Sequence, residues 1–181
     1  MRAVETDLPE VLVLEPEVLG DERGYFKESW NATTFAGLVG HDVAFVQDNS
    51  SRSRGGVVRG IHFQNPNPQA KLVRCSAGAI FDVAVDLQQS SPRFGQWVGV
   101  ELSAENHRQL WIPEGFGHGF AVLGEGADIE YKVAGYYSQS DDRAVAWDDP
   151  SIGVDWPLDG PPVLSKKDQK APKLGEADTY V

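Results

Sequence analysis

The stretch VVRGIHFQNPNPQAKLVRCSAGAIFDVAVDL, residues 57–87, decides the fold class. It contains three short runs rich in β-branched residues, and turn-forming residues stand between one run and the next. The runs are 57–63, 71–76 and 80–87. Runs of this length and composition, bounded by proline, asparagine or glycine, are typical of β-strands. The stretch therefore predicts successive strands of an antiparallel sheet.

The same pattern continues toward both ends of the chain. Further strand-like runs are 9–15, 25–30, 43–47, 96–102, 109–112, 119–123, 128–133 and 144–147. Turn residues separate them at 20–24, 55–56, 91–92, 113–115 and 124–126. Many short strands at this spacing predict an all-β fold, a barrel or a jelly roll. We find no repeat or linker, so we expect a single domain spanning residues 1–181.

Helices are expected to be few and short. Residues 32–39 fit a helix, with Asn31 as its N-cap and Gly40 closing it. The segment after Pro157 is proline-rich and then polar, and it has weak helical character at best. The predicted helices are therefore peripheral to the sheet.

The composition excludes several classes of protein. Hydrophobic residues make up 41% and charged residues 24% of the 181 positions, which is ordinary for a globular domain with its own core. No basic-then-apolar leader opens the chain and no apolar run approaches a membrane span, so we expect no membrane association. The single Cys75 cannot form an internal disulfide, and it fits the reducing cytoplasm.

A local basic patch interrupts an otherwise acidic chain. The formal net charge is −11, yet no acidic residue occurs between Asp48 and Asp82. The basic residues of this interval are Arg52, Arg54, Arg59, Lys71 and Arg74. The acidic balance argues against nucleic acid, which needs basic residues spread over a face. A confined basic patch instead indicates a site for a small anionic ligand.

His62 lies in the middle of this patch and is a candidate proton carrier, because imidazole titrates near neutral pH. The alternative is a hydrogen-bonded core histidine, which the basic surroundings disfavour. Strand alternation puts His62 and Gln64 on one face. Arg59 has the opposite parity, so a shared pocket requires a twist or bulge, for which Gly60 is available.

A general base needs an orienting carboxylate and an acid partner. Asp168 and Tyr131 are possible, although sequence spacing alone cannot select them. Asp82, flanked by Phe81 and Val83, is expected to be a buried carboxylate that needs a partner. Lys71 is the nearest candidate partner by type.

A metal-binding cupin is the alternative for this region. Residues 113–118, PEGFGH, match the P-x-G-x-x-H part of the second cupin motif. The first motif normally supplies H-x-H and a nearby Glu, but this chain has His62-Phe63-Gln64 and no acid before Asp82. An amide is a poor metal ligand, and the polar surroundings of His41 and His107 predict surface positions. We therefore expect no metal and no cofactor.

Nine motifs in order resemble the signatures of the dTDP-4-dehydrorhamnose 3,5-epimerase family. They are DERGYF (21–26), QDN (47–49), VRGIHFQ (58–64), QAKLVR (69–74), FDVAVD (81–86), SPRFG (91–95), QLWIPEGF (109–116), WDDP (147–150) and LSKKD (164–168). One such motif would be weak evidence, but nine in sequence cover nearly the whole chain.

The resemblance implies a metal-free, cupin-like jelly roll, dimeric through exchange of N-terminal strands. It implies action on dTDP-4-dehydro-6-deoxy-D-glucose in deoxysugar biosynthesis. In the family pattern His62, paired with Asp168, removes protons from C5 and C3. Tyr131 returns a proton to the opposite face, and Lys71 stabilises the enolate oxygen.

The resemblance also implies a set of substrate contacts. These are Arg23, Glu28, Gln47, Asn49, Arg59, His118 and Lys167, with Tyr137 stacking on thymine. Asp142 stands where the family usually has Glu, so that nucleotide contact is expected to be longer or absent. Two alternatives stay open: an epimerase that acts only on C3 or only on C5, and a catalytically silent nucleotide-sugar binding module. The joint presence of His62, Tyr131 and Asp168 argues against the second.

Overall fold

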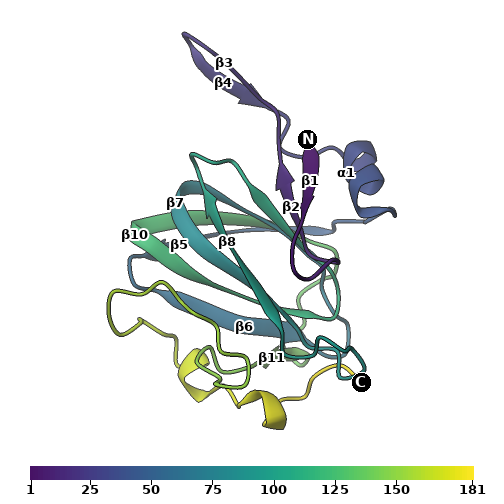
Figure 1. The fold of residues 1–181 in the computed structure, drawn as a ribbon, viewed down its shortest axis with the longest axis vertical. Coiled ribbons are helices and arrows are strands. Elements are labelled where there is room, and N and C mark those ends of the chain that lie inside the picture. The colour runs from purple at the N-terminus through teal and green to yellow at the C-terminus, as the bar shows by residue number, and fades with distance from the viewer.

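The two longest strands, β7 (Lys71–Asp86) and β10 (Phe116–Val133), pair antiparallel along almost their whole length. The computed structural model describes residues 1–181. Its main sheet has the order β1-β2-β9-β7-β10-β6-β11, and in addition β5 pairs with β10 and β8 with β7 (Figure 1). The other strands of this sheet are β1 (Arg2–Glu5), β2 (Leu12–Glu15), β5 (Gln47–Arg54), β6 (Val58–Gln64), β8 (Trp97–Ser103), β9 (Gln109–Ile112) and β11 (Asp142–Ala144).

Because β7 pairs with β9 near its start and with β8 near its end, the sheet curls into two facing layers. Between the layers lies the largest apolar core, which includes Val73, Ile80, Leu110 and Ile129. The predicted all-β jelly roll is confirmed. The sheet is curled but open, because β1 and β11 at its two edges do not pair.

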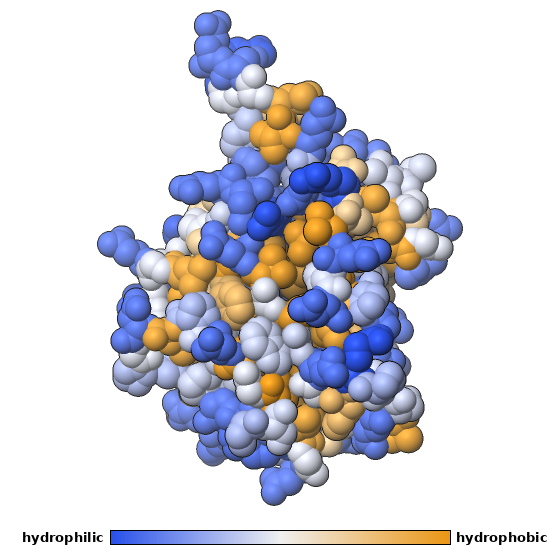
Figure 2. Space-filling view, viewed as in Figure 1, coloured by the Kyte–Doolittle hydropathy of each residue, from blue (hydrophilic) through white to orange (hydrophobic).

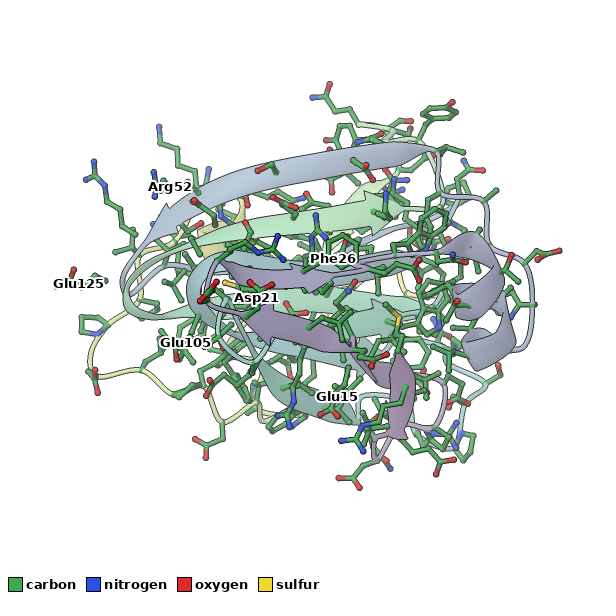
Figure 3. The ribbon with its side chains drawn as sticks, turned by 90° about the horizontal axis from the view of Figure 1, so that it is seen from above. Glu15, Asp21, Phe26, Arg52, Glu105 and Glu125 are labelled. Atoms are coloured by element: carbon green, nitrogen blue, oxygen red, sulfur yellow. The ribbon has the colours of Figure 1, made fainter.

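Two predicted turns are bends within single strands. The expected break at residues 77–78 lies inside β7, and the expected turn at 124–126 lies inside β10. The pairing shifts register between Leu123 and Asp128, and Gly78 has φ +72° with Gly126 against it. Glycine therefore marks a bulge and a close approach of two backbones here. Glu125 lies at this bent end of the sheet (Figure 3).

The predicted strand at 43–47 is also misplaced, because β5 begins only at Gln47 and runs through the polar sequence QDNSSRSR. The strands β1 and β3 were not predicted at all. The helix α1 (Ala32–Val39) is confirmed with both of its caps. Its Phe35 is buried against Trp111, with ring centroids 5.1 Å apart.

The C-terminal segment packs against the outside of β6 with little regular structure. It contains only two short 3₁₀ turns, η1 (Asp168–Lys170) and η2 (Leu174–Glu176). Its Ile152 and Leu174 join a second apolar cluster with Ile61 and Val85. This packing holds the segment beside β6, where Asp168 becomes buried. No helix of the chain is long and apolar enough to cross a bilayer.

A separate two-stranded hairpin, β3 (Val18–Asp21) and β4 (Gly24–Lys27), projects from the body (Figure 1). Leu19, Tyr25 and Phe26 on it are 59%, 60% and 70% exposed. Figure 2 shows apolar surface on this projection behind a hydrophilic tip. A two-stranded hairpin is marginally stable by itself, so these exposed side chains call for a second surface to pack on.

Candidate active site

A bulge in β6 brings two of the predicted site residues to one side of the sheet. His62 lies opposite His118, and Arg59 lies opposite Phe120, so two residues of β6 face only Gly119. Gly60 has φ +120°, and a Cβ on it would lie 2.4 Å from the Cα of Gly119. The bulge therefore requires glycine, and it reverses the parity of the strand between Arg59 and His62. The bulge for which Gly60 was available is present, although Arg59 itself does not line the pocket that His62 lines.

The bulged strand forms one wall of a pocket of about 360 Å³. Strands β5, β6, β7, β10 and β11 and the neighbouring loops all contribute to it. The lining residues are Gln47, Asn49, His62, Phe63, Gln64, Gln69, Lys71, Tyr131, Tyr137, Asp142 and Lys167. Eight of these eleven were expected to be catalytic or to contact a ligand.

His62 and Asp168 form a hydrogen-bonded pair at one wall, with His62 Nε2 and Asp168 Oδ1 2.5 Å apart. The carboxylate is buried and the imidazole is 31% exposed toward the pocket side. Ser165 Oγ donates to the other carboxylate oxygen, Oδ2, at 2.7 Å. The amide of Asp168 donates in return to Ser165 Oγ at 3.1 Å. Each carboxylate oxygen thus has one fixed partner.

The pKa values in this pair favour a neutral imidazole beside an ionised carboxylate. Burial lowers the pKa of His62, and the hydrogen bond to Asp168 only partly opposes this. Burial raises the pKa of Asp168, but the hydrogen bonds from His62 and Ser165 outweigh it, so the net shift is downward. When Nε2–H donates to Asp168, the lone pair of the ring stands on Nδ1. The imidazole can then accept a proton.

Lys71 lies on β7 in the same pocket. Burial lowers the pKa of its ammonium group to about 8, while the charge of Asp82 opposes the shift. Asp82 is fully buried, as expected, but its hydrogen-bond partner is His118, with Nε2 to Oδ1 at 2.8 Å. The interpretation of Lys71 as the direct partner of Asp82 is therefore corrected. The charge of Asp82 raises the pKa of Lys71 without a hydrogen bond between the two side chains. The second oxygen of Asp82, Oδ2, has no hydrogen-bond partner.

Tyr131 enters the pocket from β10, opposite Asn49 of β5. Burial raises the pKa of its phenol, and the positive charge of Arg59 partly offsets this. The side chain is therefore protonated at neutral pH and can donate a proton. Arg59 itself is held by Ser53, with Nε to Oγ at 3.1 Å. The ring of His118 stands behind Tyr131, with centroids 6.5 Å apart.

Three side chains form the mouth of the pocket. Lys167 Nζ lies 2.5 Å from Asp142 Oδ2, and the hydroxyl of Tyr137 donates to the same oxygen at 3.3 Å. The carboxylate of Asp142 is therefore already engaged by its neighbours. Tyr137 is 56% exposed, so one face of its ring is accessible to a ligand.

Four of the predicted substrate contacts do not line this pocket, namely Arg23, Glu28, Arg59 and His118. Arg59 and His118 lie close to Tyr131, behind the lining, whereas the other two lie elsewhere. Arg23 lies at the turn of the β3–β4 hairpin, where it is 85% exposed and paired with Asp21. Figure 3 looks down on this hairpin, with Asp21 near its turn. Glu28 follows the hairpin and accepts a hydrogen bond from Asn31. Neither residue lines the pocket of its own chain.

The structure also adds residues to which the sequence reasoning gave no role. Ser165 stands three positions before Asp168, and a serine at this spacing is typical of a local cap, so the signal was present. Gln69 and Gln64 line the pocket, but nothing in their spacing identified their partners. No three His, Cys, Asp or Glu side chains converge as possible metal ligands.

Comparison with known proteins agrees with this geometry. The family model for dTDP-4-dehydrorhamnose 3,5-epimerase matches residues 5–176. The protein of that name from Salmonella typhimurium is 56% identical, over 98% of this chain and 97% of its own length. The Escherichia coli protein of the same name is 50% identical, over 97% of this chain and 96% of its own.

Solved structures give the same result. The dTDP-6-deoxy-D-glucose-3,5-epimerase of Legionella pneumophila, in complex with dTDP-4-keto-L-rhamnose, has a TM-score of 0.94 and 48% identity, covering 97% of this chain and 93% of that one. ChmJ, a 3'-monoepimerase from Streptomyces bikiniensis in complex with dTDP-quinovose, has a TM-score of 0.89 and 34% identity, covering 97% and 88%. The chain belongs to the dTDP-4-dehydrorhamnose 3,5-epimerase family.

Proposed function

We propose that this chain is a dTDP-4-dehydrorhamnose 3,5-epimerase, an isomerase that inverts C3 and C5 of dTDP-4-dehydro-6-deoxy-D-glucose. One observation carries the proposal. The imidazole of His62, backed by the buried Asp168, opens onto the same pocket as the phenol of Tyr131 and the ammonium of Lys71. The pocket thus holds a base, an acid and a cation, the groups that an epimerisation beside a ketone needs.

The chemistry follows from the position of the C4 ketone. C3 and C5 both flank it, so removal of either proton leaves the negative charge on the same oxygen. A neutral imidazole is a far weaker base than a carbanion, and each unit of pKa mismatch costs about 1.4 kcal/mol. A cation held at the developing oxyanion reduces that cost, and Lys71 is the suitable charge. Tyr131, on a different strand from His62, then returns a proton to the other face.

The rest of the pocket fits a nucleotide diphosphate. Arg59, whose charge acts on Tyr131 from behind the lining, and Lys167, in the lining, supply positive charge, and guanidinium grips phosphate oxygens in a bidentate manner. Gln47 and Asn49 present neutral hydrogen-bonding groups from β5. Tyr137 presents an aromatic face for the thymine. The carboxylate of Asp142 is bonded to Lys167 and Tyr137 and is therefore not free to contact the ligand.

The protein acts as a homodimer in this proposal. The projecting hairpin would pack its exposed Leu19 and Phe26 on a second copy, which explains why the chain exposes them. The exchange would also carry Arg23 and Glu28 to the partner's pocket, since neither reaches the pocket of its own chain. The site is therefore completed by the partner in this proposal.

The remaining expectations fit the same proposal. We expect residues 1–181 to form one domain. Asp168, near the C-terminus, is hydrogen-bonded to His62 of β6, and β2, near the N-terminus, pairs with β9. A cytoplasmic location is supported by the buried free thiol of Cys75. The reaction needs only proton transfers, so we expect it to proceed without cofactor and to survive exhaustive chelation.

The function is tested by incubating the protein with dTDP-4-dehydro-6-deoxy-D-glucose in deuterated water and following C3 and C5 by NMR. Deuterium at both carbons together with inverted product supports the double epimerase. Label at one carbon would show a single-site enzyme, a candidate favoured by the likeness to the 3'-monoepimerase ChmJ. Tight binding of the sugar nucleotide without label would show a binding module and contradict the proposal.

A further inference from the structure

The loop that carries Tyr137 is held mainly by the side-chain amides of three glutamines. The loop comprises residues 135–138, directly after β10. The four bonds are Gln69 Nε2 to Gly135 O at 2.7 Å, Gln64 Nε2 to Tyr136 O at 3.4 Å, the Tyr137 amide to Gln47 Oε1 at 3.3 Å, and the Ser138 amide to Gln64 Oε1 at 2.7 Å. Each of the four loop residues thus has one glutamine partner on its main chain.

Two other side-chain contacts restrain this loop: the Tyr137 hydroxyl donates to Asp142 Oδ2 at 3.3 Å, and the hydroxyls of Ser138 and Ser140 lie 2.9 Å apart. Only Ser138 has a main-chain partner, because its carbonyl accepts from the amide of Asp141. The two tyrosines contribute little burial, since Tyr136 is 73% and Tyr137 is 56% exposed. A loop with so little main-chain pairing and burial would sample many conformations if its side-chain restraints were removed. The glutamine amides are therefore the main restraint on the main chain of the loop, and the bond to Asp142 restrains the Tyr137 ring only at its hydroxyl.

The glutamines themselves are well anchored. Gln64 ends β6, is 2% exposed and donates also to the carbonyl of Asn67 at 3.1 Å. Gln47 is the first residue of β5, and its amide donates to Asn49 at 2.9 Å. Because Gln64 stands two residues after His62 on the same strand, the loop is tied to the strand that carries the proposed base.

The chemistry of the amide explains why glutamine suits this role. A primary amide carries a donor and an acceptor and no charge. Gln64 uses both, because it donates to one loop carbonyl and accepts from one loop amide. A carboxylate could only accept, and a lysine could only donate, so neither could hold both groups.

We propose that Gln64 and Gln69 are positioning residues that hold Tyr137 against the nucleotide base and so set the affinity for the nucleotide. The proposal rests on the proposed function, in which Tyr137 stacks on thymine. A preorganised ring loses little conformational entropy on binding, whereas a free loop must be ordered by the ligand. Loss of a glutamine therefore weakens binding of the base and leaves the phosphate contacts in place.

The test compares Gln69→Ala with wild type, because the only side-chain hydrogen bond of Gln69 goes to the loop. Titration calorimetry with dTDP should show binding about tenfold weaker, as expected for one lost hydrogen bond. Pyrophosphate, which has no base, should bind both proteins equally. In turnover, KM should rise more than kcat falls. Gln69→Glu, of the same shape but without the donor, should behave like Gln69→Ala, and the exposed Gln96→Ala should bind dTDP like wild type.

A double-mutant cycle shows whether Gln69 acts through Tyr137. In a Tyr137→Ala background, Gln69→Ala should cause no further loss of dTDP affinity. The proposal is overturned if Gln69→Ala binds dTDP as wild type does, if pyrophosphate binding falls equally, or if the loss is undiminished in the Tyr137→Ala background. If the proposed epimerase function is wrong, the result is different: the wild-type protein binds dTDP but does not exchange substrate protons with solvent. In that case the double-mutant cycle, which measures only dTDP binding, still decides the role of Gln69.

Discussion

Asp168 and His62 stand 106 positions apart in the chain, yet Oδ1 of Asp168 lies 2.5 Å from Nε2 of His62. The C-terminal segment reaches β6 through main-chain bonds of Val163, which donates to Gly56 at 2.8 Å and accepts from Val58 at 3.2 Å. From there the chain needs only the short turn at Ser165 to present the carboxylate. A segment almost without regular structure thus delivers the partner of the proposed base.

Ser165 should prove important for rate although it lies outside the lining of the pocket. Its hydroxyl occupies Oδ2 of Asp168 and caps the amide of the same residue, which prevents rotation of the carboxylate. Ser165→Ala should lower kcat about tenfold with little change in KM, because one hydrogen bond to a charged group is lost. Ser165→Thr retains the hydroxyl and should restore most of the rate. Equal kcat in Ser165→Ala and wild type would show that Asp168 is held by other means.

The charge of Lys71 should set the alkaline limit of activity. With a pKa of about 8, the ammonium group is lost as the pH rises through that value, so kcat/KM should decline there. Asp82 is the carboxylate that most favours the charged form, so Asp82→Asn lowers the pKa and should begin the decline at lower pH. Lys71→Arg, which stays charged, should lack the decline at a reduced rate. An alkaline limb of Asp82→Asn that coincides with wild type would contradict this electrostatic coupling.

Mixing two inactive subunits tests whether the partner completes the site. Arg23→Ala subunits retain His62, and His62→Ala subunits retain Arg23, so a mixed dimer has one complete site if the hairpin is exchanged. Co-refolding equal amounts should recover about a quarter of wild-type kcat/KM, since half of the dimers are mixed and each has one complete site of two. As a control, the two variants carry different affinity tags, so that the mixed dimer can be purified and assayed apart from the two homodimers. No recovery in that fraction would place Arg23 in its own chain's site, whereas an Arg23→Ala homodimer that is active by itself would place Arg23 outside any site.

The sequence predicted the elements whose signals are local. Helix α1 was foreseen because Asn31 and Gly40 are cap residues, and the bulge because Gly60 interrupts an apolar strand. The bends at Gly78 and Gly126 were predicted to be turns because glycine is common both in turns between strands and in bends within a strand. Only the pairing with a distant strand distinguishes the two cases. The partner of Asp82 was missed for the same reason, since His118 meets it only across the pairing of β7 and β10. The polar strand β5 lacks the apolar alternation that identifies a strand.

The division of labour between His62 and Tyr131 is the central claim. Without the imidazole no proton leaves either carbon, so His62→Ala should abolish both epimerisation and solvent exchange, with a loss of about 10²–10⁴-fold or more. Without the phenol, His62 can still remove a proton and return one from solvent on the same face. Tyr131→Phe should therefore take up deuterium while forming little inverted product.

The deciding measurement is NMR of the substrate recovered from deuterated water after incubation with each variant. The account predicts deuterium at C3 and C5 without inversion for Tyr131→Phe and no deuterium for His62→Ala. If Tyr131→Phe blocks exchange as completely as His62→Ala does, the assignment of separate base and acid to the two residues is wrong.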